Sequence, residues 1–267
     1  MNSISASVIL AILVTLSLLI SVRSAAEEKH RNGSYELVKG MEYLKSIENV
    51  NPDTANEFFR SRHKEKAADS DEKAKLISDI NDESVDVFSL FKDYVLLGDS
   101  RALGFSHFGF LDYNRVFASG GDTILKSLDH IDRMKKLDPS YIFLCYGIND
   151  AGGSKWKTTE AYVEDVLKVI NQLEREFPDA KIILSSIIWI SDGANRNFPK
   201  WGRIYEFNPA CRQMCLENGI TYVDNDEICG TLKEDRLWSG DGIHLSKSFY
   251  KMWAKNLWLA TLEDSES

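Results

Sequence analysis

A serine, an aspartate and a histidine stand in sequence contexts where they could act together on a carbonyl carbon. Ser100 ends a Gly-Asp-Ser tripeptide directly after an apolar run, which places it on an exposed turn at the start of a helix, close to backbone N–H groups. Asp241 and His244 are separated by two residues, so their loop can fold the carboxylate back onto the imidazole. The other ring nitrogen would then accept the proton of a serine hydroxyl. These residue types indicate nucleophilic catalysis.

Two further residues could bind the oxyanion that forms when a carbonyl is attacked. Asn149, after another apolar run, offers a side-chain amide, and Gly121 offers a backbone N–H that substrate can approach closely. Each signal also has a simpler interpretation. Gly-Asp-Ser is a common turn sequence, and Asp241 could cap a helix beside a surface His244. Asn149 could form an Asx turn, and Gly121 could serve only a tight turn.

The sequence from Asp93 onward predicts an α/β fold around a parallel sheet. Short apolar runs alternate there with amphipathic segments, which is typical of βα units. Each of the first three runs leads into a polar turn that contains glycine, and such turns meet at the carboxyl edge of a parallel sheet. We expect strands at Tyr94–Leu97, Arg115–Ala118, Tyr141–Tyr146, Lys181–Ile190 and Ile220–Val223. We expect helices at Thr123–Leu137, Thr158–Phe177, Ile204–Asn218 and Ser246–Leu262.

Four short segments resemble the signature blocks of the SGNH (GDSL-type) hydrolase superfamily, in the same order and at compatible spacings. They are VLLGDS (Val95–Ser100), ASGGDT (Ala118–Thr123), YGIND (Tyr146–Asp150) and DGIH (Asp241–His244). Each block is a weak signal alone, and the four together are a strong one. The resemblance covers about Asp93 to Leu262. It implies a flavodoxin-like, three-layer α/β/α domain with a parallel sheet of about five strands, the SGNH hydrolase fold.

The resemblance also implies a role for each residue named above. Ser100 becomes the nucleophile, His244 the base and Asp241 the partner that orients it. The oxyanion hole consists of the Ser100 backbone, Gly121 and Asn149. Of two adjacent glycines we choose Gly121, because the glycine of the family directly precedes Asp-Thr. The implied activity is that of a carboxylic ester hydrolase, and we expect no cofactor and no metal.

The neighbours of these residues bear on the substrate. Arg101 follows the serine where many SGNH relatives have a small or apolar residue. Its guanidinium either contacts a polar or anionic substrate or pairs with an acidic neighbour on the surface, and we favour the pairing. Trp156, Trp189 and Trp201 lie in or beside the loops after the third and fourth strands. Their rings either pack against sugar rings or belong to the core.

Three functions share this predicted site. The first is an esterase that removes short acyl groups, such as O-acetyl groups, from small esters or acylated carbohydrate through an acyl-enzyme on Ser100. The second is an acyltransferase that moves the same acyl group onto a sugar. The third is a catalytically inactive binding domain at the cell surface, which the presence of Ser100, Asn149, Asp241 and His244 disfavours.

Composition limits the partners and suggests the compartment. The formal net charge of −9 and the lack of a basic block argue against nucleic-acid binding. Arg23 is the first charged residue, so residues 1–26 read as a signal peptide or an N-terminal membrane anchor, the only membrane contact we expect. Residues 27–92 read as a charged helical accessory segment and residues 93–267 as the SGNH hydrolase domain. We therefore expect an extracytoplasmic protein, either secreted or anchored.

The chain has four cysteines, too few for a disulfide scaffold at this length. Cys145 lies within an apolar run and is predicted to be a reduced thiol in the core. Cys211 and Cys215 share one helical face, and either could pair with Cys229 in an oxidising compartment. A metal site is disfavoured, because no histidine or further cysteine lies nearby in sequence.

Overall fold

The computed structural model describes residues 70–231 and 237–263 of the 267-residue chain. The signal or anchor segment 1–26 and most of the accessory segment lie outside these residues, so both stay predictions from the sequence. Within the described residues, no helix combines the length and the apolar character needed to cross a bilayer.

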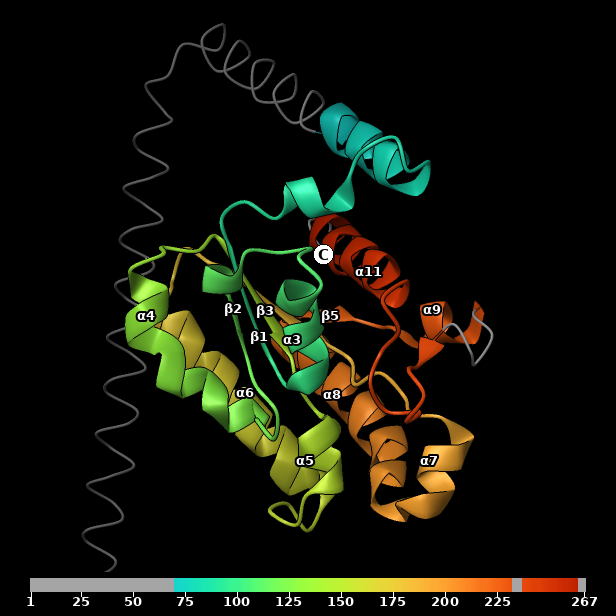
Figure 1. Cartoon of the computed structure of the whole chain (residues 1–267). Helices are drawn as coiled ribbons and strands as arrows, with labels where there is room; N and C mark the ends of the chain where they lie inside the picture. Colours follow the sequence, from blue (N-terminus) through green and yellow to red (C-terminus); the bar gives the residue numbers. More distant parts are fainter. Residues whose placement is uncertain (1–69, 232–236, 264–267) are drawn as a thin grey trace, which may run out of the picture. The chain divides into compact units, whose positions relative to one another are not determined.

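A parallel sheet of five strands forms the centre of the fold (Figure 1). The strand order is β2-β1-β3-β4-β5, and each neighbouring pair is parallel. Strands of such a sheet are buried on both faces, which explains why β1 is apolar along its whole length. The strands are β1 (Tyr94–Gly98), β2 (Val116–Ala118), β3 (Tyr141–Cys145), β4 (Lys181–Ser185) and β5 (Thr221–Val223).

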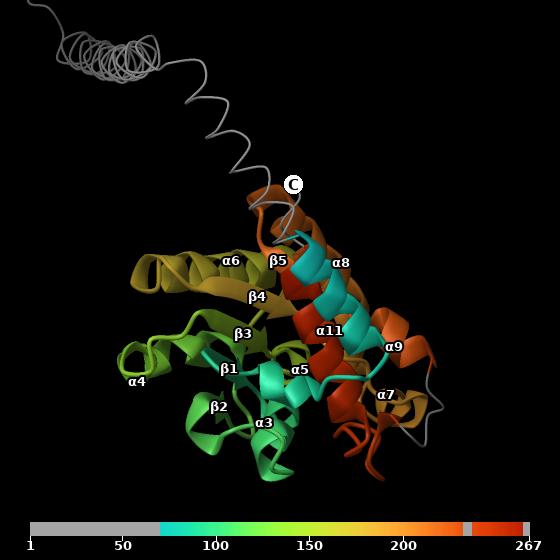
Figure 2. The same ribbon diagram turned by 90° about the horizontal axis from the view of Figure 1, so that it is seen from above.

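Helices cover both faces of the sheet and complete three layers (Figure 2). Alternate residues of β1 point to opposite faces, as strand geometry requires: Val95 and Leu97 join one core, Tyr94 and Leu96 the other. The first core packs against η3 (Ile124–His130), α4 (Ile131–Lys135), α5 (Ile148–Gly152), α6 (Thr159–Glu176) and α8 (Ile204–Asn218). The second packs against η1 (Val87–Leu90), α3 (Ser100–His107), α9 (Asp226–Thr231) and α11 (Phe249–Glu263). The predicted three-layer α/β/α fold is confirmed.

Two elements differ from the prediction. The helix expected over residues 123–137 is a 3-10 helix, η3, followed by the short α4. The strand expected to run to residue 190 ends at Ser185. Beyond it, the side-chain amide of Asn208 bonds both the N–H and the carbonyl of Ile187, at 2.9 Å each. These bonds occupy the backbone groups that a longer strand would use.

The compact unit that contains the sheet begins at Asp71, so the boundary that the sequence placed at residue 93 falls within it. Apolar residues are spaced among the charges of this segment. Ile80, Val87 and Phe91 are buried in the core on the α11 side. The ring of Phe91 meets that of Trp258 edge-on, with centroids 5.4 Å apart. We therefore assign residues 71–92 to the same unit as the sheet.

The sheet separates the cysteines that could have paired. Cys211 and Cys215 are buried in the core on the α8 side, whereas Cys229 is buried in the core on the α11 side. Within the described residues, no disulfide joins them. Cys145 is a buried thiol at the end of β3, as predicted, and burial raises its pKa.

Candidate active site

Ser100 is the first residue of α3, at the carboxyl end of β1. Asp99 caps this helix, because its carboxylate accepts a hydrogen bond from the N–H of Arg101 at 2.9 Å. Gly98 is required for the close approach of α3 to the sheet, since a Cβ there would overlap Ala102 and the backbone of Cys145. The turn therefore presents a partly exposed Ser100 hydroxyl beside the free N–H groups of a helix N-terminus.

A hydrogen-bonded series connects Ser100 to the loop of residues 239–244, here called the triad loop. His244 Nε2 lies 3.1 Å from Ser100 Oγ, and His244 Nδ1 lies 2.6 Å from Asp241 Oδ2. The second Asp241 oxygen accepts the N–H groups of Ile243 and His244 at 2.9 Å and the Ser239 hydroxyl at 3.0 Å. The structure thus brings together the three residues that the sequence analysis assigned to a triad, in an arrangement that serine hydrolases use.

The triad loop keeps Asp241 ionised. Partial burial alone would raise its pKa, but the bonds from His244, two backbone N–H groups and Ser239 hold that pKa well below its ordinary value. About half of each side chain is exposed, 50% for His244 and 45% for Asp241. A carboxylate with this charge fixes the imidazole tautomer, and the exposure leaves the site open to a large substrate.

The two predicted oxyanion donors lie on the turns that follow β2 and β3. Gly121 is exposed and has a positive φ of 85°, so the glycine is needed for the turn as well as for close approach. Asn149 lies in the first turn of α5, and its Nδ2 donates to the carbonyl of Asp122 at 2.8 Å. The amide has a second hydrogen available to an oxyanion. Asn149 therefore also holds the Gly121 turn in place.

Two buried aspartates, which the sequence analysis did not assign, tie these turns together. Asp99 accepts the N–H of Ile148 at 3.2 Å, and Asp150 accepts the N–H of Ile124 at 3.0 Å. Burial raises the pKa of both, that of Asp150 to about 7. Their signal in the sequence was a charged residue at the end of an apolar run.

The environment of Arg101 differs in one respect from the surface pairing that the sequence analysis favoured. It pairs with an acidic neighbour, as predicted, but the pair is buried and not on the surface. The side chains of Arg101 and Asp99 are only 3% and 1% exposed, with Nε and Oδ1 3.9 Å apart.

Of the three tryptophans, one lies in the core and two are partly buried against it. Trp156 is buried, and its Nε1 donates to Asp165 at 2.9 Å, so it belongs to the core. Trp189 is partly buried and packs against Tyr205. Trp201 is partly exposed, and its Nε1 donates to the carbonyl of Ile148 at 3.0 Å, directly beside Asn149.

A hollow of about 690 Å³ borders the triad loop on its Asp241 side. It lies against α7 (Asp192–Asn197), which belongs to the connection between β4 and α8. Its lining includes Asn197, Trp238 and Phe198, and the ring of Phe198 is half-exposed. The residues that line it include no lysine and no arginine. This hollow is the space next to the triad loop that could take part of a substrate.

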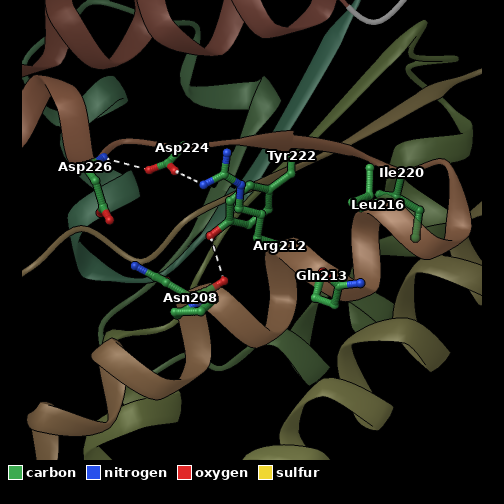
Figure 3. A pocket seen from close by; sticks show the side chains of 9 residues that line it. Asn208, Arg212, Gln213, Leu216, Ile220, Tyr222, Asp224 and Asp226 are labelled. Carbon is green, nitrogen blue, oxygen red and sulfur yellow. Dashed lines mark hydrogen bonds and ion pairs between the residues drawn. The ribbon is translucent and has the colours of Figure 1, made fainter. Parts of the chain in front are cut away.

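A second hollow, of about 440 Å³, lies between α8 and the edge strand β5 (Figure 3). Its polar groups pair with one another. Arg212 NH1 lies 3.3 Å from Asp224 Oδ2, and the Tyr222 hydroxyl donates to the Asn208 carbonyl at 3.2 Å. None of its lining residues is one of the predicted catalytic residues, so we do not assign it to the reaction.

The described residues contain no group of three or more His, Cys, Asp or Glu side chains placed to hold a metal ion.

Comparison with known proteins identifies the class. The family model of the GDSL-like lipase/acylhydrolase family matches residues 97–252, more than half of the chain. The chain belongs to this family and is a carboxylic ester hydrolase, which confirms the resemblance seen in the sequence. The matched range contains Ser100, Gly121, Asn149, Asp241 and His244. No curated protein sequence gives a significant match.

Several solved structures are similar to this chain at low sequence identity, and the first one named below shows the same fold. A GDSL-like lipase from Bacteroides thetaiotaomicron is 14% identical, with 67% of this chain and 94% of that chain covered and a TM-score of 0.50. A lipase/acylhydrolase from Enterococcus faecalis is 18% identical, with coverages of 66% and 95% and a TM-score of 0.46. A catalytic mutant of an acetylxylan esterase from Geobacillus stearothermophilus is 17% identical, with coverages of 66% and 95% and a TM-score of 0.48.

Replacing Asn149 with alanine should lower kcat by about 10²–10³, with little change in KM. If the amide is an oxyanion donor, it stabilises the charge of the tetrahedral intermediate, and a neutral carbonyl gains little from it. Steady-state kinetics on a chromogenic short-chain ester measures both constants. A raised KM with an unchanged kcat would instead make Asn149 a ground-state binding residue.

Proposed function

We propose that the chain removes short acyl groups, such as O-acetyl groups, from carbohydrate by way of an acyl-enzyme on Ser100. The observation that carries this proposal is the hydrogen-bonded series from Ser100 Oγ through His244 to Asp241. A serine hydroxyl is a weak nucleophile unless a neighbouring base takes its proton, and His244 Nε2 is within reach of that proton.

The reaction follows from this geometry. Ser100 Oγ attacks the acyl carbon while its proton passes to His244 Nε2. The Ser100 and Gly121 N–H groups and the Asn149 amide stabilise the oxyanion. The bond to the alcohol then breaks, and the alcohol leaves with the proton from His244. Water attacks the acyl-enzyme with His244 as base again, which releases the carboxylic acid and restores Ser100. Asp241 keeps its charge throughout and stabilises the imidazolium.

The hollow beside the triad loop supports a neutral, polar alcohol such as a sugar. Its volume of about 690 Å³ lies within the usual range of small-ligand sites. Apart from the Asp241 carboxylate, its side chains are aromatic, apolar or neutral and polar, and aromatic faces pack well against the apolar faces of sugar rings. The ring of Phe198 is 53% exposed and meets the ring of Trp201 edge-on at 5.2 Å. The ring of Phe198 is thus exposed to solvent beside the triad loop and is held in place by its contact with Trp201.

Replacing Phe198 with alanine should raise KM for an acetylated oligosaccharide about threefold to tenfold and leave kcat within about twofold. A small chromogenic acetate does not reach this ring, so its kinetics should not change. Tyr113→Ala is a matched control, because Tyr113 also has an exposed ring. It lies in the segment that precedes the edge strand β2, whereas Phe198 follows β4. Equal loss on both substrates in Phe198→Ala would contradict a sugar-binding role for this residue.

Acyl transfer is a second candidate, which the exposure of the triad loop favours. The acyl-enzyme would then react with a sugar hydroxyl in place of water. Adding an unacetylated oligosaccharide to a reaction with a small acetyl donor separates the two functions. A hydrolase releases all the acyl groups as free acid, whereas a transferase forms acetylated oligosaccharide.

A further inference from the structure

Arg101 is a buried cation directly after the nucleophile. Its guanidinium faces Asp99, with Nε 3.9 Å from Oδ1, and its NH1 donates to the carbonyl of Ile188 at 2.6 Å. Burying a charge pair costs free energy that its attraction only partly offsets, so stability alone is a weak reason for such a pair. The position of the pair, under the turn that carries Ser100, suggests a role in geometry.

The segment that Arg101 bonds also holds the triad loop. Three residues after Ile188, the N–H of Ser191 donates to the carbonyl of Gly242 at 2.8 Å. Between them, the carbonyl of Trp189 accepts the indole N–H of Trp238 at 2.9 Å. Residues 188–191, here called the bridge segment, therefore connect the residue after the nucleophile to the loop that carries His244. Because β4 ends at Ser185, the bridge carbonyls are available for these bonds.

The backbone of Arg101 is fixed as well. Its N–H donates to the Asp99 carboxylate at 2.9 Å, and its carbonyl accepts the Tyr250 hydroxyl at 2.7 Å. The Tyr250 ring lies against Gly104, where a Cβ would overlap it. The first turn of α3 is therefore held from α11 on one side and from the bridge segment on the other.

We propose that Arg101 is a positioning residue for ester hydrolysis, which holds the Ser100 turn and the triad loop in register through the bridge segment. The inference rests on the proposed function of Ser100 and His244. The contact it controls is the 3.1 Å separation between Ser100 Oγ and His244 Nε2. A displacement of about 1 Å between reacting groups can cost about 10²-fold in rate, so a small slip at this point is sufficient to slow the reaction.

The charge of Arg101 has a second consequence, through Asp99. Burial raises the pKa of Asp99, and the Arg101 charge opposes that rise. The Asp99 carboxyl group accepts the Ile148 N–H and so anchors α5, which carries Asn149. The titratable and charged groups that interact with Asp99 are Arg101 on α3, His244 on the triad loop, Cys145 and Tyr146 at the end of β3, Asp150 on α5, Tyr162 on α6 and Tyr250 on α11.

Arg101→Met should therefore lower kcat about tenfold to a hundredfold on a chromogenic acetate, with KM within about threefold. It should also move the acidic limb of the pH–kcat profile to higher pH. The reason is that Asp99 without its cation has a still higher pKa, and its bonds weaken as the pH falls through that value. Arg101→Lys keeps the charge but cannot face Asp99 and bond Ile188 together, so kcat should be intermediate and the acidic limb unmoved.

The matched control is Arg175→Met, the same change at an exposed position on α6, which should alter neither kcat nor the profile. Thermal unfolding confirms that each variant is folded. If Arg101→Met does not fold, Arg101→Lys decides: a reduced kcat at unchanged KM supports the proposal.

Two results would overturn the inference. One is a kcat and a pH profile equal to those of the wild type in a folded Arg101 variant. The other is a raised KM at unchanged kcat, which would make Arg101 a substrate contact. A wild-type protein with no esterase activity would instead contradict the proposed function, before any variant is compared.

Discussion

Ser100→Ala should lower kcat for ester hydrolysis by about 10⁴–10⁶, to the small residual rate that the oxyanion donors and substrate binding support without a nucleophile. The substitution removes Ser100 Oγ, the proposed nucleophile and the oxygen that His244 Nε2 contacts, so no acyl-enzyme can form. Its effect on the fold should be small, because Ser100 is partly exposed and Asp99 still caps α3. The measurement is steady-state hydrolysis of a chromogenic acetate at a high enzyme concentration.

The matched control for Ser100→Ala is Ser106→Ala on the same helix, which removes a hydroxyl that bonds only a helix carbonyl. That variant should keep full activity. A kcat in Ser100→Ala that stays within about a hundredfold of the wild-type value, in a preparation free of contaminating esterase, would assign the nucleophile elsewhere.

Asp241→Asn should lower kcat by about 10³–10⁴, the second largest effect expected. The asparagine oxygen can still accept the N–H groups of Ile243 and His244, so the loop should keep its shape. Its amide, however, donates to His244 Nδ1, where the carboxylate accepted. The proton then sits on Nε2, and His244 cannot act as a base toward Ser100.

The pH dependence of the wild type provides a check on the role of Asp241. The pKa of Asp241 is held below its ordinary value, so the carboxylate stays ionised at pH values where a free aspartate would be protonated. The stability that its charge contributes is fully present above the ordinary pKa and is lost as the pH falls through the lowered pKa. Ser239→Ala removes one of the bonds to Asp241 and should lower kcat less than tenfold. A loss in Ser239→Ala as large as that in Asp241→Asn would show that loop shape matters more than the carboxylate.

Much of the site could be predicted because its residues follow strand ends that are plain in the sequence. The apolar run of β1 is buried throughout and that of β3 from Ile142 onward, and the polar residues after them fall at the carboxyl edge of the sheet. The spacing of Asp241 and His244 is local, so it predicted the contact between them. His244 and Ser100 lie far apart in the chain, and only the resemblance to the SGNH signature blocks predicted that they act together.

Other features depend on contacts between distant segments, and local patterns do not report them. Residues 186–190 look like the end of a strand, but Asn208 and Arg101 bond their backbone and end β4 early. The residue type of Arg101 predicts an exposed side chain. Its guanidinium is nevertheless buried, because it pairs with Asp99 and donates to the carbonyl of Ile188. The spacing of Cys211, Cys215 and Cys229 permitted a pairing that the intervening sheet prevents.

The central claim is that Ser100 forms a covalent bond with the acyl group. The most direct test treats the folded protein with a serine-directed fluorophosphonate, which loses fluoride to the attacking oxygen, and locates the adduct by peptide mass spectrometry. We predict one adduct per chain, on the peptide that contains Ser100, formed more slowly in Asn149→Ala and absent in Ser100→Ala. An adduct on another residue, or esterase activity that survives without any adduct, would contradict it.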